Sequence, residues 1–210
     1  MTDASATRGL TPTGNRATMA VTGARRMSVQ EMRPALFVDR DGTLITDVGY
    51  IKDPADVELI PDSANAIRRM NDARWPVIVV TNQSGIARGI LTFDDYEAVR
   101  ARLDHKLAQR GAHIDPHYYC SHHPDFSGPC ARRKPATQLY DRASADHAVT
   151  PSVSVFVGDR WRDVAPALHY GARGILVPGP HTPPEEIALA REQAAVARTL
   201  AEAVHRILQT

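Results

Sequence analysis

The stretch that decides the fold is ALFVDRDGT, residues 35–43, in which a short apolar run feeds directly into two aspartates and a glycine. Apolar runs of this length are typical of strands that are buried on both faces of a parallel sheet. The pattern recurs at residues 77–80 and 153–157, and each of these runs is also followed by polar residues. The sequence therefore predicts parallel strands with polar side chains at their carboxyl ends.

Helices are expected between these runs, because capping residues precede apolar residues at helical spacing. The candidate caps are Asp62, Thr92 with Asp95, and Thr199 with Glu202. Residues 174–177 predict a further strand, and the alanine-rich stretch near Ala194 predicts either helix or a short edge segment. Strands that alternate with helices predict an α/β fold with a doubly wound parallel sheet of the Rossmann type, which binds ligands beyond the carboxyl ends of its strands.

Composition narrows the class of protein. The chain has 210 residues, 43% of them hydrophobic, which is enough for one core. With 25 Lys and Arg against 24 Asp and Glu, the formal net charge is +1, so nothing in the charge balance favours a nucleic acid as principal partner. Two cysteines cannot form a disulfide framework, and the apolar runs are too short to span a bilayer. We expect a cytoplasmic monomer with no membrane partner.

The first part of the chain differs from the rest. Residues 1–33 are rich in Thr, Ala, Ser and Gly and lack apolar periodicity, which predicts a disordered tail ahead of one domain at residues 34–210. Two alternatives stay open. The segment is Arg-rich and poor in acids, as organelle transit peptides are, although it lacks the apolar core of a signal peptide. Met27 and Met32 lie just ahead of the first strand, so the start codon could also be placed too far upstream.

Two carboxylates, Asp39 and Asp41, share the end of the first strand. A phosphate ester repels anions, so a carboxylate attacks phosphorus only when a cation neutralises the group and the geometry is in line. Mg²⁺ suits this role, with Asp39, a backbone carbonyl near Asp41 and the distant Asp159 as ligands. Asp39 would form an aspartyl-phosphate, while Asp41 would act as general acid and then base. Alone, the pattern is also typical of a turn or a calcium loop.

Three further segments favour the phosphate interpretation. Thr81 and Asn82 offer a hydroxyl and backbone amides for phosphate oxygens. Lys134 offers an ammonium for the phosphoryl group, and Arg133 a guanidinium for a second group of the substrate. The stretch 158–163, Gly-Asp-Arg-Trp-Arg-Asp, adds two carboxylates for a metal and its surroundings. Alone, these segments are typical of a turn, a solvated basic face and a helix cap.

Together the motifs resemble those of a known family. Asp39-x-Asp-Gly-Thr, Thr81-Asn, Lys134-Pro and Gly158-Asp-x-x-x-Asp163 resemble, in this order, the four motifs of the haloacid dehalogenase superfamily. The resemblance covers roughly residues 34–180. More narrowly, TNQSGIARG at 81–89, YCSHHP at 119–124 and RKP at 133–135 are similar to the D-glycero-D-manno-heptose 1,7-bisphosphate phosphatases and the histidinol-phosphate phosphatases. This subgroup has no large cap domain and closes its site with loops.

The resemblance implies the same site residues as the motifs and adds further ones. The implied catalytic residues are Asp39, Asp41, Thr81 and Lys134. The implied substrate-binding residues are Asp47, Val48, Gly49, Tyr50, Asn82, Gln83, Ser84, Arg133 and Arg160. The implied Mg²⁺ ligands are Asp39, Asp41 and Asp159, with Asp163 close by.

The resemblance also implies a structural zinc, held in the family by Cys-x-His and Cys-x-Cys just before Arg-Lys-Pro. Cys120, His122 and Cys130 match, but Arg132 stands where the second cysteine is expected. His123 or a residue of the loop 124–129 could substitute. A cation beside the metal argues against zinc, so we expect clearly less than one zinc per chain. A second departure is the Ala-Thr pair at residues 136–137, since the family usually has Pro-Gly soon after the lysine.

These motifs favour a phosphatase that removes one phosphate from a heptose bisphosphate, with histidinol phosphate as the alternative substrate. A catalytically inactive phosphosugar-binding module is a candidate from another class. The presence of both Asp39 and Asp41 counts against it. A nucleic-acid 3′-phosphatase shares the four motifs, but the balanced charge and the narrower resemblance place it third.

Overall fold

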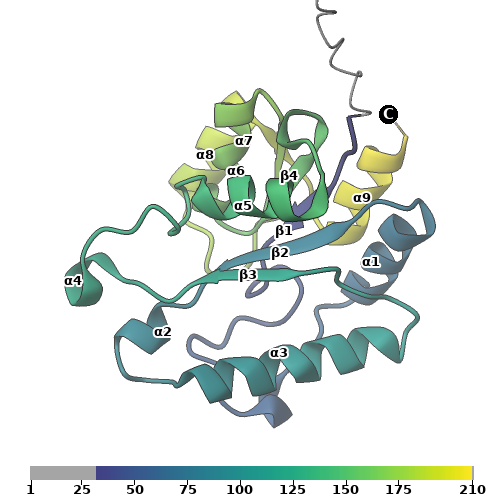
Figure 1. Ribbon diagram of the computed structural model, residues 1–210. Coiled ribbons are helices and arrows are strands. Elements are labelled where there is room, and N and C mark those ends of the chain that lie inside the picture. The colour runs from purple at the N-terminus through teal and green to yellow at the C-terminus, as the bar shows by residue number, and fades with distance from the viewer. Residues whose placement is uncertain (1–31, 210) are drawn as a thin grey trace, which may run out of the picture. The chain divides into compact units, whose positions relative to one another are not determined.

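The protein is described by a computed structural model over residues 32–209. Six parallel strands form one sheet in the order β3-β2-β1-β4-β5-β6 (Figure 1). They are β1 Leu36–Val38, β2 Val77–Asn82, β3 His117–Cys120, β4 Val155–Gly158, β5 Arg173–Leu176 and β6 Ala195–Val196. Because the chain runs outward from β1 in both directions, the sheet is doubly wound, as the sequence predicts.

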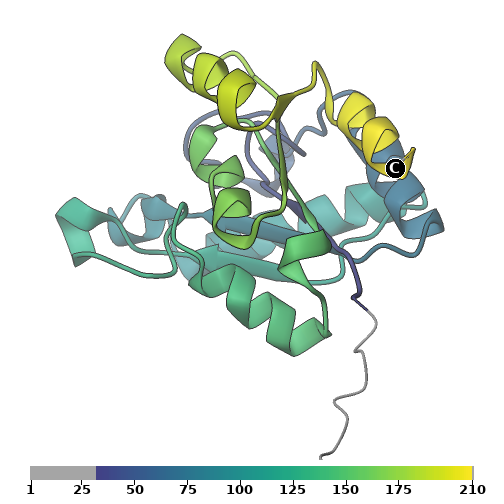
Figure 2. The ribbon, with the colours of Figure 1, turned by 90° about the horizontal axis from the view of Figure 1, so that it is seen from above.

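Helices cover both faces of the sheet (Figure 2). They are α1 Ser63–Asp72, α2 Ser84–Ala87, α3 Phe93–Ala108, α4 Pro124–Ser127, α5 Gln138–His147, α6 Trp161–Val164, α7 Pro166–Tyr170, α8 Pro184–Gln193 and α9 Leu200–Leu208, with 3-10 turns at Pro54–Asp56 and Pro151–Val153. Successive side chains of a strand point to opposite faces. Leu36 and Val38 therefore pack against α1, α3 and α9, whereas Phe37 packs against α5 and α7. The sheet is buried on both sides, which explains its continuous apolar strands.

Two of the predicted caps differ in detail from the structure. Thr92 and Asp95 form the full capping box of α3, as predicted. Asp62 precedes α1 but has a left-handed backbone with φ of 64° and makes no side-chain capping bond. Thr199 accepts a hydrogen bond from the amide of Glu202, yet the Glu202 carboxylate accepts from the amide of Arg198, so only half of the capping box forms.

Some strand boundaries also differ from the predicted ones. The third apolar run contributes its first residue, Val153, to a 3-10 turn, and β4 begins only at Val155. The alanine-rich stretch near Ala194 ends helix α8 and forms β6, the short edge strand that was one of its two predicted forms. The other edge strand, β3, has no continuous apolar run, because only Tyr118 and Cys120 of its residues are buried.

The predicted tail falls almost wholly on residues 1–31, which lie outside the described residues, and the domain boundary at 34 remains a prediction. Residues 34–209 lie within one compact unit. Within the described part of the chain, no helix has the length and apolar composition that crossing a membrane requires.

Candidate active site

The carboxyl ends of β1, β2 and β4 meet at one edge of the sheet, where they place Asp39, Thr81 and Asp159. Asp39 leaves β1 with its amide bonded to the Val157 carbonyl at 2.9 Å, so the sheet fixes its backbone. Gly42 turns the chain back with a φ of 79°. A Cβ at Gly42 would lie 2.5 Å from Asp159 Oδ2, so this position needs glycine for space as well as for backbone conformation.

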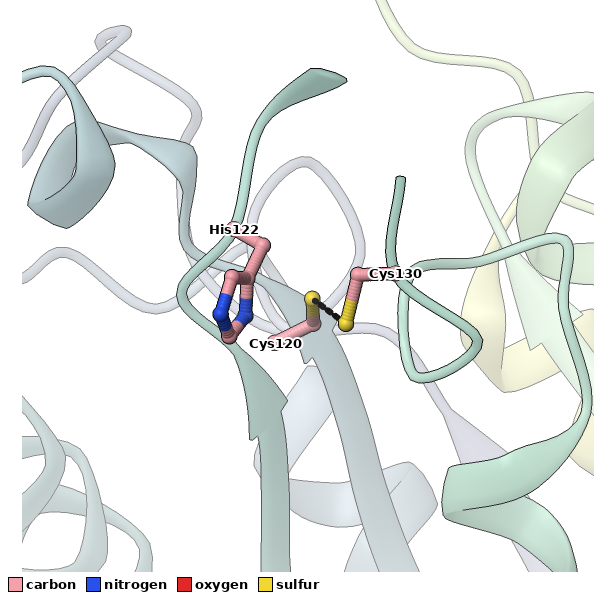
Figure 3. A group of neighbouring side chains, drawn as sticks. All are labelled: Cys120, His122 and Cys130. Atoms are coloured by element: carbon pink, nitrogen blue, oxygen red, sulfur yellow. Dashed lines mark hydrogen bonds between the residues drawn. The ribbon is translucent and has the colours of Figure 1, made fainter. Parts of the chain in front are cut away.

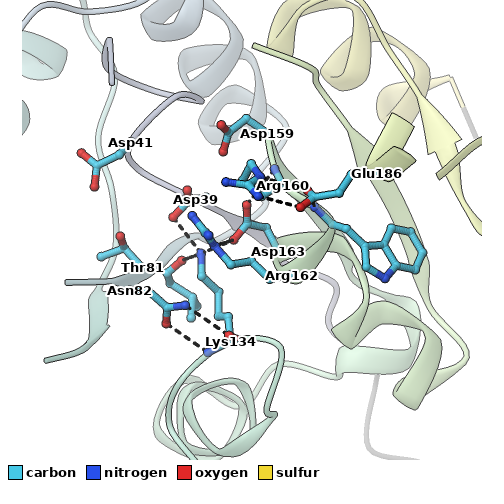
Figure 4. Close-up of polar contacts among 12 residues, drawn as sticks. Asp39, Asp41, Thr81, Asn82, Lys134, Asp159, Arg160, Arg162, Asp163 and Glu186 are labelled. Atoms are coloured by element: carbon cyan, nitrogen blue, oxygen red, sulfur yellow. Dashed lines mark hydrogen bonds and ion pairs between the residues drawn. The ribbon is translucent and has the colours of Figure 1, made fainter. Parts of the chain in front are cut away.

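Lys134 lies at the centre of this edge and is buried (Figure 4). Its Nζ atom is 2.7 Å from both Asp39 Oδ1 and Asp163 Oδ1, and it donates to the Val80 carbonyl at 2.6 Å. Asn82 holds the lysine backbone from both sides, with hydrogen bonds of 3.0 and 3.2 Å. Burial alone would lower the pKa of Lys134, but the two carboxylates outweigh it and raise the pKa, so the ammonium stays charged.

Three buried carboxylates, Asp39, Asp159 and Asp163, place oxygens within 4.8 Å of one another. Lys134 pairs with two of them, Asp39 and Asp163, and supplies one positive charge. Asp159 Oδ1 is buried without a hydrogen-bond partner, and burial, helped by the charges of Asp39 and Asp163, raises the pKa of Asp159 to about 8. Hard carboxylate oxygens with uncompensated charge suit Mg²⁺. The residues therefore fit the predicted metal, with Asp39 and Asp159 as ligands and Asp163 beside them.

Asp41 stands apart from this cluster, as Figure 4 shows. Both of its carboxylate oxygens lie 3.0 Å from the guanidinium of Arg40, and Gln83 Nε2 donates to Asp41 Oδ2 at 2.8 Å. The same Gln83 nitrogen donates to Thr81 Oγ1 at 3.1 Å. Burial raises the pKa of Asp41, against the opposing effect of Arg40. The side chain of Asp41 is thus not a ligand in this arrangement, and only its backbone carbonyl remains as a predicted Mg²⁺ ligand.

These groups open into a cavity of about 310 Å³. The cavity is lined by Asp39, Asp41, Asp47, Gly49, Tyr50, Thr81, Asn82, Gln83, Ser84, Arg133, Lys134 and Arg162. Eleven of these twelve residues are in the set that the sequence nominates. Val48, which the resemblance also implies as a substrate-binding residue, is 60% exposed and does not line the cavity.

Arg160 is the second nominated substrate-binding residue that the cavity lining lacks, and the nearby Arg162 takes part instead. The Arg160 guanidinium pairs with Glu186 of α8 through contacts of 2.6 and 3.0 Å, and Glu186 also accepts from the Trp161 amide at 2.6 Å. This pairing turns Arg160 away from the cavity (Figure 4). The sequence gives no signal for it, because Glu186 lies 26 residues further along the chain.

Cys120, His122 and Cys130 lie together beyond the end of β3 (Figure 3). Their two sulfurs are 3.7 Å apart, close to the edge of about 3.8 Å that Zn–S bonds of about 2.3 Å give a tetrahedron. Arg132 lies next to this group, and its Nη2 atom is 3.5 Å from His122 Nδ1. The group therefore offers three ligands and a neighbouring cation.

His123 does not complete the set. One of its ring nitrogens lies 2.9 Å from Arg88 Nη2, and the other accepts from the Asp125 amide at 3.2 Å. Among the described residues, no further His, Cys, Asp or Glu joins the three ligands, so the loop 124–129 supplies none. Both substitutes that the sequence left open are thus absent from this arrangement.

Comparison with known proteins agrees with this geometry. The polynucleotide kinase 3 phosphatase family model matches residues 35–166, and the HAD-hydrolase-like model matches residues 131–203. The D-glycero-D-manno-heptose-1,7-bisphosphate 7-phosphatase of Thermosynechococcus vestitus is 42% identical over 157 residues, which are 69% of this chain and 79% of that protein. The corresponding enzyme of Escherichia coli K12 is 36% identical, over 74% of this chain and 85% of that protein.

A solved structure gives the same result. The D,D-heptose 1,7-bisphosphate phosphatase from B. bronchiseptica, complexed with magnesium and phosphate, matches with a TM-score of 0.76 and 32% identity. The match covers 84% of this chain and 98% of that one. The shared fold, the four ordered motifs and the identity over most of both chains lead to one conclusion: this chain is a phosphatase of the haloacid dehalogenase superfamily, in the subgroup of the heptose bisphosphate phosphatases.

Proposed function

We propose that this protein hydrolyses a phosphomonoester through an aspartyl-phosphate on Asp39, with Mg²⁺ as cofactor. One observation carries the proposal. The Asp39 carboxylate lines the cavity, 2.7 Å from the buried Lys134 ammonium and beside the uncompensated carboxylate of Asp159. When bound by Asp39 and Asp159, Mg²⁺ supplies positive charge that neutralises the phosphoryl oxygens.

The residues of the chain divide the reaction among them. Asp39 attacks phosphorus, while Lys134 neutralises the phosphoryl group and keeps the nucleophile in place. Thr81 offers its hydroxyl to a phosphoryl oxygen. Asp41 lines the same cavity and donates a proton to the leaving oxygen, then accepts one from the attacking water. To do so it leaves its contact with Arg40, because that contact uses both carboxylate oxygens.

For the substrate we propose D-glycero-D-manno-heptose 1,7-bisphosphate. Three features support it: the identity to enzymes of that name, the polar lining of the cavity and the arginines at its wall. Asp47, Gly49 and Tyr50 lie on the loop after β1 and line the cavity, so they are placed to contact the sugar. Histidinol phosphate remains the second candidate, because the histidinol-phosphate phosphatases share the motifs quoted above.

A phosphate-release screen tests this proposal. It compares heptose 1,7-bisphosphate, histidinol phosphate, other sugar phosphates and a DNA 3′-phosphate, each with Mg²⁺ and with EDTA. We expect Mg²⁺-dependent release with the highest kcat/KM for the heptose bisphosphate. A preference for the DNA 3′-phosphate would replace the proposed substrate by the one named in the polynucleotide kinase 3 phosphatase model. Binding of phosphosugars without any turnover would indicate the inactive module.

A further inference from the structure

Two arginines line the cavity without a carboxylate partner of their own. Arg133 lies on the loop that follows β3, and Arg162 lies on α6, so two separate elements bring them to one wall. Arg133 Nη1 donates to the His122 carbonyl at 3.0 Å. Among residues 32–209, no carboxylate lies within ion-pair distance of Arg133. Its charge is therefore not compensated within the described part of the protein.

In the described residues, Arg162 has only one carboxylate contact, and it is weak. Its Nε atom is buried without a hydrogen-bond partner. Its contact with Asp163 is long, 3.9 Å from Nε to Oδ1, and that oxygen is already 2.7 Å from Lys134 Nζ. Burial lowers the pKa of Arg133, and the positive charge of Arg162 lowers it further.

The other charges of the cavity wall are engaged. Asp39 pairs with Lys134, and Asp41 pairs with Arg40. Asp47 Oδ1 accepts a hydrogen bond from the backbone two residues further on. Two mutually repelling guanidinium groups facing one cavity cost free energy unless an anion binds between them. The wall is thus complementary to a group that carries more than one negative charge.

We infer that Arg162, together with Arg133, forms a subsite for the second phosphate of a bisphosphate, the one that remains on the product. The identity of this ligand rests on the proposed function. Each guanidinium presents paired N–H donors that match two phosphate oxygens, and a phosphate dianion balances both cations. The reacting phosphate would be held by Lys134 and by the Mg²⁺ that the carboxylate cluster would bind, so the subsite distinguishes a bisphosphate from a monophosphate.

The competing assignment is Arg160, which the family resemblance nominates for substrate contact. In this structure Glu186 binds Arg160 through two contacts and so satisfies its charge. Releasing it would break both contacts and leave Glu186 without its guanidinium partner. Arg162 would give up only its long contact with Asp163. The two assignments therefore predict different effects of substituting Arg160 and Arg162, and one variant at each position distinguishes them.

The experiment measures kcat/KM for heptose 1,7-bisphosphate and for heptose 7-phosphate, and takes their ratio. The variants are Arg162→Gln, Arg133→Gln, their double variant and Arg160→Gln, with Arg191→Gln on the exposed side of α8 as matched control. We expect the ratio to fall about tenfold or more in Arg162→Gln, as for a lost charge-assisted hydrogen bond. The double variant should lose less than the product of the single losses, since both residues bind one group.

Two outcomes would overturn the inference. One is an equal loss for both substrates in Arg162→Gln, which would mean that Arg162 only balances the charge of the neighbouring carboxylates. The other is a fall of the ratio in Arg160→Gln. Thermal unfolding of each variant identifies losses that come from instability.

A binding measurement separates this inference from the proposed reaction. Calorimetry without Mg²⁺ compares the two sugar phosphates on the unmodified protein and on Arg162→Gln. If neither substrate is hydrolysed but the bisphosphate binds more tightly in an Arg162-dependent way, the proposed function fails and the subsite stands. If turnover occurs but the two ligands bind equally well to both proteins, the subsite is wrong and the proposed function stands.

Discussion

The strand ends and the loop after β3 position their functional side chains by different means. At the strand ends, the sheet itself fixes the backbone of Asp39. Lys134 comes from the loop, but its hydrogen bonds to Val80 and Asn82 tie it to β2. The loop carries Arg133, which donates a hydrogen bond to the His122 carbonyl. The family resemblance implies a zinc cage that would stiffen this loop, but here Arg132 stands in the fourth ligand position. Chemistry at the strand ends is therefore determined by the fold, and chemistry on the loop by a few side chains.

The strand-end half of this comparison predicts the largest effect. Asp39→Asn should reduce phosphate release to background, because an amide neither attacks phosphorus nor neutralises Mg²⁺. The fold should persist, since the sheet positions this residue through backbone bonds, and circular dichroism and the melting temperature check this. Near-normal release by a preparation free of unmodified protein would refute the assigned nucleophile.

Asp41→Asn tests the second strand-end carboxylate and should have a smaller effect. Loss of a general acid and base should lower kcat on the order of a hundredfold or more for a sugar phosphate. The loss should shrink for a substrate such as p-nitrophenyl phosphate, whose leaving group needs no proton. An equal loss for both substrates would move the acid role elsewhere, with Asp41 acting only through its contacts with Arg40 and Gln83.

The same division explains what the sequence could predict. The sheet and the strand-end residues follow from local patterns, because apolar runs followed by Asp39, Thr81 and Asp159 need only the parallel topology to bring them together. Arg162 and the Arg160–Glu186 pair could not be predicted, since side-chain direction around the short helix α6 depends on a distant glutamate. Local pattern carries no information about such a partner.

β3 and the Asp41 contacts show the same limit. β3 lies at the edge of the sheet with only alternate residues buried, so it lacks the continuous apolar signal of the central strands. Arg40 looks like an unremarkable residue between two aspartates, yet it is buried and binds Asp41 with two contacts. The family resemblance implies that Gln83 contacts the substrate. In this structure its side-chain amide donates hydrogen bonds to both Asp41 and Thr81.

Metal binding at the strand ends should depend on pH. The pKa of Asp159 in the metal-free protein is raised to about 8, so below this pH the carboxyl is protonated and Mg²⁺ must displace the proton. The apparent Mg²⁺ affinity should therefore rise as pH increases from 6 to 8, by at most about tenfold per unit for one proton, and level off above.

Calorimetry in two buffers of different ionisation enthalpy measures the proton released with each Mg²⁺ bound. Asp159→Asn provides the control, because it removes the titrating group together with the ligand. Affinity that does not change between pH 6 and 8 would mean that Asp159 is already ionised without the metal. The raised pKa has a second consequence, which runs in the opposite direction with pH. The folded metal-free protein binds this proton more tightly than the unfolded chain does, so its stability should decrease as pH rises toward 8.

The smallest effect is expected on the loop side, where zinc removal should change little. Cys120, His122 and Cys130 offer three ligands, and both ring nitrogens of His123 are engaged elsewhere. A site with three protein ligands and the cation of Arg132 nearby should bind zinc more weakly than a closed four-ligand cage. We predict clearly less than one zinc per purified chain, with melting temperature and Mg²⁺-supported activity nearly unchanged by a zinc chelator.

The variant Arg132→Cys tests this explanation further, because it removes the cation and supplies the missing fourth ligand in one step. The variant should bind one equivalent of zinc, and its melting temperature should rise by several degrees with zinc and return with a chelator, since the metal binds only the folded loop. Arg132→Ser is the matched control, as it removes the charge without adding a thiolate. If elemental analysis finds a full zinc equivalent in the unmodified protein, and chelation lowers its melting temperature, three ligands suffice. The loop would then be held by metal just as firmly as the sheet holds the strand ends.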